Sequence, residues 1–342
     1  MFKRAGMMFF YTLTPLHPGS GASVAAVDLP IQRERHTNYP MIQASGVKGA
    51  LRDLAEELVD KERIKIVFGP ETEAASEHGG ALSLTDARIL LFPVRSVKGV
   101  FTWITCPGVI ARLQRDLEVL GATNGDSFDT GILQQVAQLP LTSGQAFASK
   151  ESDAVLQKDR ENEQVILEDF CFDLQQGDDQ RKKVEELARW LADNALPAKL
   201  DYWKEKLKKD LVLLSDDDFK EFVEMSTEVI TRVKLGEKGT VDVGPWDEEH
   251  LPSEALLYSL ALATDPKLGK EDLEKSPIKN AEQVLRLLNT NLAGKSHIMQ
   301  FGGDETVGKG LVQVRYFDGQ KGKSGGESPE ERPVVGGDGD GL

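Results

Sequence analysis

The sequence is poor in several features that would identify common classes of protein. It has only two cysteines, Cys106 and Cys171, so it offers neither a disulfide framework nor the paired spacing of a zinc site. It contains no run of roughly 18 apolar residues and no cationic N-terminal segment followed by an apolar stretch. None of its serines lies in a G-x-S-x-G motif, so a hydrolase triad finds no support. We therefore expect a cytoplasmic protein with no membrane partner.

The chain also lacks a net positive charge. The chain carries 56 acidic against 41 basic residues, a formal net charge of −15 at pH 7, which by itself argues against a nucleic-acid-binding protein. Binding depends on local potential, however, and the acidic residues concentrate in residues 151–225 and 237–254. Residues 28–52 hold a cluster of basic side chains, Arg33, Arg35, Lys48 and Arg52, together with the titratable His36. This strip predicts an anion-binding surface on an acidic protein.

Apolar patterning predicts an α+β fold. Residues 7–14 are apolar, aromatic and β-branched, as in a buried strand. Ser45 is a candidate N-cap for a helix, because apolar residues recur after it at helical spacing, at Val47, Leu51, Leu54 and Leu58. Strand patterns follow at 81–96 and 101–107, and a helical pattern at 107–120. This β-α-β-β-α order is typical of a ferredoxin-like or RRM-like core.

The chain is interpreted as four segments. Residues 1–120 form the first part of the core. Residues 121–225 form a helical insertion, because stretch 178–210 places Leu and Trp at three- and four-residue spacing with charged outer faces. Residues 226–317 contribute two strands around a polar loop, then a helix and a last strand, and complete the core. Residues 318–342 are rich in Gly, Pro and acids and are expected to be disordered.

A glycine-rich string, QFGGDETVGKG at residues 300–310, has the G-x-x-x-x-G-K spacing of a phosphate-binding P-loop. The next residue, Gly310, cannot supply the magnesium ligand that Ser or Thr provides in a P-loop. The following LVQVRYF is a strand pattern, whereas a P-loop leads into a helix. Nucleoside triphosphate binding is therefore not expected. Two interpretations remain: a plain tight turn, or a loop whose bare amides hold a backbone phosphate together with Lys309.

A second candidate for phosphate binding is ASGVKGALR, residues 44–52. Its glycines, Gly46 and Gly49, allow another backbone to approach closely. Lys48 and Arg52 lie four residues apart and therefore on one helical face, near a helix N-terminus that favours an anion. The alternative is a solvated helix start with no ligand.

Five blocks of the sequence carry a resemblance to a known family. They are TPLHPGSG, VDLPIQRERHTNYP, SGVKGALR, EEHLP and FGGDETVGKG, and all of them lie between residues 12 and 315. Together they resemble the signature blocks of the RAMP superfamily, and within it they are most similar to the backbone subunits of type III-B CRISPR (Cmr) RNA-targeting complexes. The glycine-rich block is shared across RAMP proteins. The DLPIQRE block is more specific and weighs against the type III-A backbone subunit.

The resemblance implies an RRM-like core with a projecting thumb, which is expected within residues 226–317. It also implies that several copies of the subunit stack along one guide RNA. It implies that an aspartate lies beside the paired target RNA, which is cut at regular intervals with a divalent metal, Mg²⁺, present. By position this aspartate, which is also the implied metal ligand, is Asp28. The family's loop histidine falls on His17, and its acidic residue before LP falls on Glu248. His250 stands where relatives often carry tyrosine, and no role is assigned to it.

The resemblance also implies contacts to RNA. Guide phosphates are expected to lie against Ser45, Lys48, Arg52, Gly302, Gly303, Thr306, Gly308 and Lys309. Three side chains of the basic strip, Arg33, Arg35 and His36, are expected to steady the scissile phosphodiester or to bind guide backbone.

The chemistry of RNA cleavage is compatible with these assignments. RNA carries its own nucleophile, the 2′-hydroxyl, and a carboxylate assists either as a base or as a ligand of a magnesium ion. Asp28 lies on a proline-stiffened loop, and such pre-positioning suits both roles. The residues alone leave other interpretations open: Asp28 as a turn former, His17 as a packing residue in a tight loop, and Glu248 as part of a solvated acidic run.

The sequence thus predicts a guide-RNA-binding backbone subunit that acts as a divalent-metal-dependent endoribonuclease. Its expected partners are guide RNA, complementary target RNA, other copies of itself and other subunits of the effector complex. Guide–target pairing would read the sequence, while the protein grips backbone and shape. Two alternatives remain. One is a non-catalytic scaffold that binds guide RNA, and the other is a guide-processing RAMP endoribonuclease that cuts hairpin RNA alone, using histidine.

Overall fold

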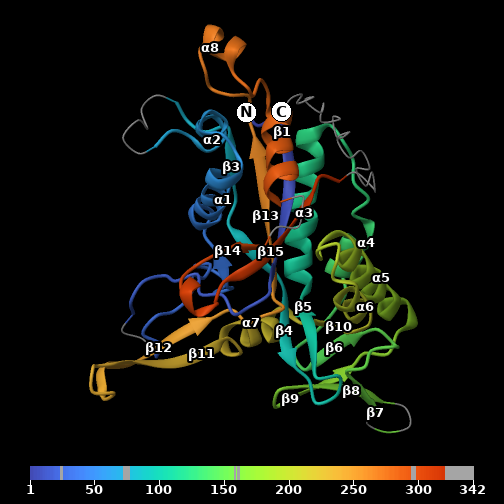
Figure 1. Cartoon of the computed structure of the whole chain (residues 1–342). Helices are drawn as coiled ribbons and strands as arrows, with labels where there is room; N and C mark the ends of the chain where they lie inside the picture. Colours follow the sequence, from blue (N-terminus) through green and yellow to red (C-terminus); the bar gives the residue numbers. More distant parts are fainter. Residues whose placement is uncertain (24–25, 72–77, 158, 160–161, 294–297, 320–342) are drawn as a thin grey trace, which may run out of the picture.

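The computed structural model describes the whole chain except residues 24–25, 72–77, 158, 160–161, 294–297 and 320–342. A large, mostly antiparallel sheet runs through the described part, and helices pack along it (Figure 1). The predicted α+β class is confirmed. The tail expected to be disordered, residues 318–342, lies almost entirely outside the described residues.

Strand β1 (Arg4–Thr12) is central, because it pairs antiparallel with both β13 (Leu256–Ala263) and β15 (Leu311–Phe317). Every residue of β1 after Arg4 is buried. A strand covered on both faces has no polar alternation, which is why its sequence, AGMMFFYT, is an almost continuous apolar run. The buried strand predicted at residues 7–14 is confirmed, with both ends shifted toward the N-terminus.

The strand order of the sheet is β14-β15-β1-β13-β4-β5-β10-β6-β9-β8-β7, while β2 pairs with β4 and β3 pairs with β13. The strand patterns at 81–96 and 101–107 correspond to β3, β4 and β5. The bounds of the other strands of this sheet are β2 (Met41–Ile42), β3 (Leu82–Leu84), β4 (Ala87–Arg95), β5 (Phe101–Thr105), β6 (Gln145–Ala148), β7 (Val155–Gln157), β8 (Glu163–Leu167), β9 (Phe170–Leu174), β10 (Leu211–Leu214) and β14 (Ile298–Gln300).

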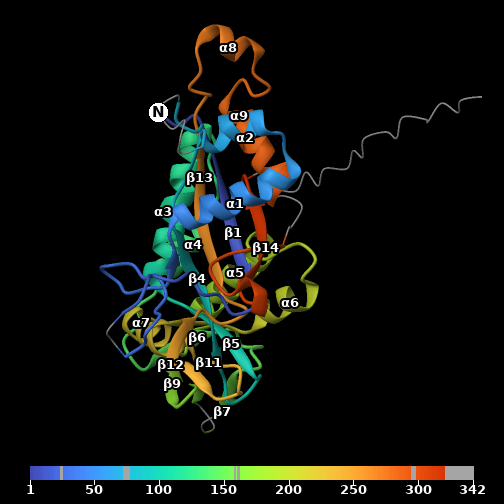
Figure 2. The ribbon, with the colours of Figure 1, turned by 60° about the vertical axis from the view of Figure 1, so that its left-hand side comes forward.

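Helices pack on this sheet from several parts of the chain. Helix α3 contacts β1 and β4, and α9 contacts β1 and β13. Figure 2 shows α1 crossing in front of β1. None of the helices in the described residues is long and apolar enough to cross a membrane. The helices are α1 (Ala44–Leu58), α2 (Lys61–Phe68), α3 (Pro107–Asn124), α4 (Gly131–Ala137), α5 (Asp178–Asn194), α6 (Asp201–Lys209), α7 (Asp216–Met225), α8 (Lys270–Lys275) and α9 (Ala281–Leu287), which continues as a π-helical turn (Leu288–Ala293).

The expectation that Ser45 caps helix α1 is wrong. Gln43 occupies the N-cap position, its side chain makes no cap hydrogen bond, and Ser45 is an exposed residue inside the first turn. The carboxylate of Asp86 accepts a hydrogen bond from the amide of Ala44 at 2.8 Å. A side chain from the turn between β3 and β4 therefore satisfies an amide of the first turn that a local cap would otherwise bind.

Residues 121–225 contain strands as well as helices. Helices α5 and α6 occupy the stretch 178–210, as predicted. Strand β10, however, pairs in parallel with β5, and β6 to β9 continue the main sheet beyond it. The segment is therefore an extension of the sheet with helices on it, and is not purely helical. The domain boundaries proposed from the sequence stay predictions.

A hairpin stands where a polar loop was expected after residue 235. Strand β11 (Glu228–Leu235) pairs with β12 (Val241–His250) in a separate two-stranded sheet, which projects from the body in Figure 1. The sequence of β12, VDVGPWDEEH, contains Gly, Pro and four acids, all of which are rare in strands. Its extended form depends on its partners, so local propensity did not indicate it.

Two loops near the end of β1 meet through glycine. The amide of Gly303 donates to the carbonyl oxygen of His17 at 3.0 Å, and the amide of Gly310 donates to that of Pro15 at 2.8 Å. Gly302 has a φ of +70°, and a Cβ at this position would lie 2.2 Å from the His17 carbonyl oxygen. Because Gly302 has no side chain, the backbone of the glycine-rich loop approaches the backbone at His17 more closely than any other residue would allow.

We expect Gly302→Ala to lower the free energy of unfolding by about 3 kcal/mol, because alanine adds both a left-handed strain and a clash with the His17 carbonyl. Gly308→Ala is the matched control. Gly308 has a φ of +76°, but nothing lies within 4 Å of the methyl group that alanine would add, so we expect a loss of about 1 kcal/mol. Urea unfolding of both variants measures the difference, and equal losses would contradict the packing role of Gly302.

Candidate active site

Four segments that are far apart in the sequence meet at the base of the β11–β12 hairpin. They are residues 15–19, residues 28–31, the end of β12 and the glycine-rich loop. Backbone bridges join them: Leu16 pairs with Leu251, and Leu29 pairs with Glu248. All three side chains expected to take part in catalysis lie in these segments.

Residues 28–31 run parallel to the end of β12. The amide of Leu29 donates to the carbonyl of Asp247, and the amide of Glu249 donates to the carbonyl of Leu29, both at 3.0 Å. Oδ2 of Asp28 accepts a hydrogen bond from the amide of Asp247 at 2.9 Å. The loop is therefore ordered by a strand that follows 219 residues later, and the exposed carboxylate of Asp28 is held in one place.

The buried carboxylate of Glu249 anchors this arrangement. Its Oε1 accepts hydrogen bonds from Arg33 at 2.5 Å and from the hydroxyl of Thr227 at 2.8 Å. Its Oε2 accepts one from the amide of Ile31 at 3.0 Å. One carboxylate thus ties the Asp28 loop to both strands of the hairpin, because Thr227 directly precedes β11.

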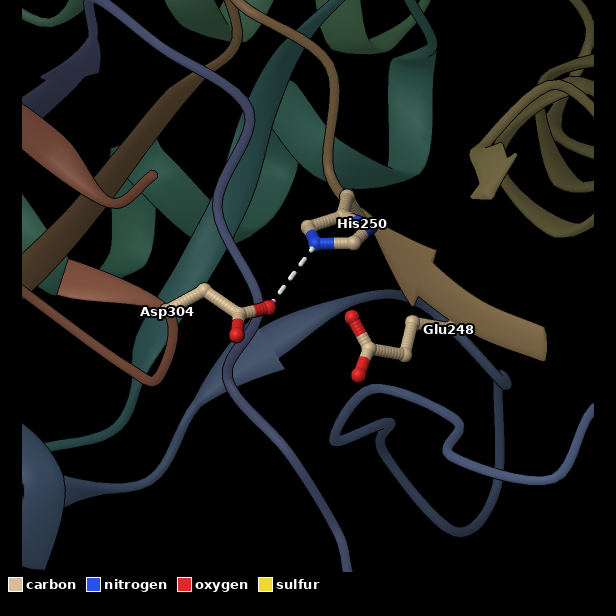
Figure 3. A group of neighbouring side chains, drawn as sticks. All are labelled: Glu248, His250 and Asp304. Carbon is tan, nitrogen blue, oxygen red and sulfur yellow. Dashed lines mark ion pairs between the residues drawn. The ribbon is translucent and has the colours of Figure 1, made fainter. Parts of the chain in front are cut away.

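Next to this anchor, Glu248, His250 and Asp304 gather around one point (Figure 3). Each offers one atom able to bind a metal, and these atoms all lie within 4.8 Å of one another. Nη1 of Arg232 lies 2.5 Å from Oε2 of Glu248 and 2.8 Å from Oδ1 of Asp304. The indole of Trp246 donates to Oε1 of Glu248 at 2.8 Å. Both oxygens of Glu248 therefore accept hydrogen bonds from the hairpin.

The protonation states in this cluster follow from burial and charge. His250 is 1% exposed, and burial, followed by the nearby His17 and Lys309, lowers the pKa of its imidazole below the usual 6.5. At Asp304, burial favours the neutral acid, but Arg232 and the other hydrogen-bonding neighbours outweigh it, so the pKa of this carboxyl is lowered. The imidazole is thus neutral and the Asp304 carboxylate ionised at neutral pH.

His17 lies against the same region. Its Nδ1 is 2.6 Å from the carbonyl oxygen of Glu249, and the centre of its ring is 5.3 Å from that of the His250 ring. A carbonyl oxygen only accepts, so Nδ1 carries the proton and donates it. The Nε2 atom of a neutral His17 is therefore left as an acceptor.

The basic residues expected to bind RNA differ in how the fold uses them. Arg33 is largely committed within the protein, since its guanidinium also donates to the carbonyls of Asn38 and Val223. Arg35 is exposed, and His36 is exposed and lies 3.2 Å from a nitrogen of Arg112.

The residues expected on α1 lie on a separate element from the Asp28 loop. Nζ of the half-buried Lys48 donates to the carbonyl of Leu82, and burial lowers the pKa of this ammonium. Arg52 contacts the carbonyl of Gly69 and the carboxylate of Glu56.

The glycine-rich loop holds the other expected RNA contacts. Gly302 and Gly303 pack on His17, and Thr306 is exposed in a short 3-10 helix (Glu305–Val307). Gly308 and Lys309 follow this helix, and the Lys309 amide donates to the carbonyl of Asp304. The structure thus brings the glycine-rich loop and the Asp28 loop to one site.

Three residues of this site were not singled out in the sequence. Asp304 lies inside the quoted glycine-rich string, and its φ of +65° is a conformation that aspartate adopts more readily than most residues. Arg232 becomes a neighbour of Glu248 only through the hairpin register, which places it opposite Trp246. Glu249 sits in an acidic run that is usually a solvated surface, so the sequence carries no signal for its burial.

We expect Glu249→Ala to lower the free energy of unfolding by about 3–5 kcal/mol, because Arg33 would keep a largely buried charge without its partner. Glu237→Ala, an exposed glutamate of the same hairpin, is the matched control and should change stability by less than about 0.5 kcal/mol. The double replacement of Arg33 and Glu249 by methionine should cost less than Glu249→Ala alone. Chemical denaturation measures all three, and a loss below about 1 kcal/mol in Glu249→Ala would refute the anchor.

Comparison with known proteins agrees with the resemblance seen in the sequence. The model of the RAMP superfamily matches residues 9–313. The CRISPR system Cmr endoribonuclease Cmr4 of Pyrococcus furiosus is 40% identical over 315 residues, which are 91% of this chain and 95% of the relative. The crystal structure of oligomeric Cmr4 from the same organism matches with a TM-score of 0.63 at 34% identity, over 92% of this chain and 98% of that one.

A more distant structure shares the fold. A chain in the cryo-electron microscopy structure of the type III-B Cmr-beta complex bound to cognate target RNA matches with a TM-score of 0.67 at 22% identity. The match covers 92% of this chain and 98% of that one. The superfamily match and the 40% identity to a relative of almost equal extent lead to one conclusion: this chain belongs to the RAMP superfamily and, within it, to the Cmr4 family.

Proposed function

We propose that this chain is a guide-RNA-binding backbone subunit of a type III-B CRISPR effector complex and that it cleaves complementary target RNA at regular intervals. The observation that carries the proposal is the pairing of the Asp28 loop with β12, which fixes an exposed carboxylate on the end of this strand. The same end of β12 carries Glu248 and, through the Glu249 carbonyl, holds His17. Membership of the Cmr4 family, with a relative named as an endoribonuclease, supports it.

In the proposed reaction the 2′-hydroxyl of the target RNA attacks the adjacent phosphate and loses its proton. The bond from phosphorus to the 5′-oxygen of the next nucleotide breaks, which leaves a 2′,3′-cyclic phosphate and a 5′-hydroxyl that takes its proton from water. Asp28 either takes the proton of this hydroxyl or holds a divalent metal. The second role fits the site, because Mg²⁺ prefers carboxylate oxygens, keeps several waters, and needs an exposed ligand such as Asp28. A Mg²⁺ ion there would offset negative charge on the phosphate.

His17 and Glu248 have supporting roles in this proposal. The acceptor Nε2 of His17 is suited to hydrogen bond a hydroxyl of the RNA. Glu248 has both oxygens occupied by Arg232 and Trp246, so it acts by holding the hairpin to the glycine-rich loop through Arg232 and not as a base. Asp28 is then the one catalytic residue that we assign to proton transfer or metal binding.

The proposal also covers RNA binding and assembly. The strand order β15-β1-β13-β4 supports an RRM-like core, and the projecting β11–β12 hairpin is the candidate thumb. Basic side chains on α1 and in the glycine-rich loop hold guide phosphates, while base pairing reads the sequence. Copies of the chain stack along the guide in a cytoplasmic complex with other subunits, which is supported by the oligomeric crystal structure of a relative.

In a reconstituted complex with no wild-type copy, we expect Asp28→Asn to reduce target cleavage by at least about 100-fold while assembly and guide binding stay unchanged. The readout is the ladder of evenly spaced products from end-labelled complementary RNA with Mg²⁺. Asp242→Asn, an exposed aspartate on the hairpin, is the control and should leave the ladder intact.

Other outcomes of the cleavage assay would refute the assignment. A ladder that survives Asp28→Asn would mean that other residues cut the RNA. The absence of a ladder from the wild-type complex would favour the non-catalytic scaffold. Cleavage of hairpin precursor RNA by the isolated chain would favour the guide-processing alternative.

We expect the affinity for guide RNA to fall with salt, with a slope in log K against log [salt] that is smaller by about 0.7 in Lys48→Ala than in wild type. The reason is that one phosphate would lose its neutralising lysine. Lys270→Ala, an exposed lysine on α8, is the control and should keep the wild-type slope. An unchanged slope in Lys48→Ala would show that Lys48 neutralises no phosphate.

A further inference from the structure

The proposed cleavage at Asp28 gives Glu248 a supporting role but uses neither His250 nor Asp304, which lie beside it. The His250 imidazole is almost fully buried, and neither of its ring nitrogens makes a hydrogen bond to another described residue. Nε2 of His250 and Oδ2 of Asp304 face each other in the ion pair of Figure 3, at a separation too long for a good hydrogen bond, and neither atom has another hydrogen-bond partner in the described part of the chain. Burying polar groups with such incomplete partners costs about 1–3 kcal/mol each, and a ligand between the two atoms would satisfy both.

The spacing of these atoms indicates what that ligand is. Nε2 of His250 and Oδ2 of Asp304 are 3.5 Å apart. Two ligands bound to one tetrahedral ion at ~2.1 Å lie about 3.4 Å from each other, so a single ion fits between these atoms. A carboxylate oxygen of Glu248 completes a set whose members are all within 4.8 Å, and Figure 3 shows the three side chains pointing toward one another.

We propose that Glu248, His250 and Asp304 form a binding site for one divalent transition-metal ion. The ligands are Nε2 of His250 and one oxygen of each carboxylate. Three protein ligands leave a fourth position for water or for an oxygen of a phosphate. The site joins β12 to the glycine-rich loop, so metal binding also fixes the base of the hairpin to the body of the protein.

Arg232 would compete with the metal ion for the carboxylates of Glu248 and Asp304. Its Nη1 bridges the same two carboxylates, Glu248 and Asp304, and so supplies one positive charge where the ion would supply two. The Arg232 side chain is 30% exposed, which leaves it a path into solvent when the ion binds. This predicts that removing the guanidinium strengthens metal binding, the opposite of what a purely structural role of Arg232 predicts.

The chemistry of the ligands separates this site from a magnesium ion at Asp28. Imidazole nitrogen with two carboxylates favours Zn²⁺, Co²⁺ or Mn²⁺, whereas Mg²⁺ prefers oxygen ligands only. The inference goes beyond the proposed function, because it concerns metal binding by the chain without RNA. A failure here leaves the Asp28 cleavage assay unaffected, and the reverse also holds.

The test is a Co²⁺ titration of the purified, RNA-free full chain after treatment with a chelator, followed by visible absorption. We expect one Co²⁺ per chain, with the ligand-field bands of a site of low coordination number, displaced by Zn²⁺ and not by a large excess of Mg²⁺. His250→Phe should weaken binding by at least about tenfold. His78→Phe, a histidine outside the cluster, is the matched control and should bind as wild type does.

Two further variants keep the test decisive. Asp304→Asn removes a ligand charge at nearly constant volume, so it replaces His250→Phe if the latter does not fold, and it should weaken binding to a similar extent. Arg232→Gln should bind Co²⁺ several-fold more tightly than wild type. Absence of stoichiometric Co²⁺ binding to the wild-type chain, or wild-type affinity in both His250→Phe and Asp304→Asn, would overturn the proposal.

Discussion

The carboxylate of Glu249 is a buried negative charge held by three donors from two segments of the chain. A guanidinium, a hydroxyl and a backbone amide surround it, supplied by Arg33, Thr227 and Ile31. A buried charge is costly unless each of its lone pairs is satisfied, so the donors must all be present at once. This requirement fixes the position of the Asp28 loop relative to the hairpin. It thereby also fixes the place of the Asp28 carboxylate.

Charge at this site is arranged in two adjoining layers. Glu249 faces the Asp28 loop and is neutralised by Arg33, while Glu248 faces the glycine-rich loop and is neutralised by Arg232. Consecutive residues of a strand point to opposite sides, so one acidic pair serves two different neighbours. Glu248 and Glu249 belong to an acidic run of a kind that usually forms a solvated surface. In the structure both are buried, and they form ion pairs on opposite sides of the strand.

Local sequence patterns were sufficient for the elements whose apolar residues face one core. The continuous apolar run of β1 and the helical spacing in α1 follow directly from burial. The class of fold and the family were therefore accessible from the sequence. All four site segments were also found. Strings with Pro or Gly mark residues 15–19, 28–31 and 302–304, and the family resemblance of the EEHLP block marks the end of β12.

Each feature that the sequence did not indicate depends on contacts between residues that are far apart in the chain. The cap of α1 comes from Asp86, which lies 42 residues away, so Ser45 was a reasonable but incorrect choice. Strand β12 is extended because β11 and the Asp28 loop pair with it, and its own composition disfavours a strand. The position of Arg232 beside Asp304 needs the hairpin register and the left-handed turn together.

The spread of the site along the chain has a consequence for biosynthesis. His17 is synthesised more than 200 residues before β12, and the glycine-rich loop that closes on His17 is synthesised after β12. During most of translation the Asp28 loop has no strand to pair with, and its cations have no buried acid beside them. A nascent chain that ends before β12 therefore lacks the strand and the Glu249 carboxylate that hold the Asp28 loop.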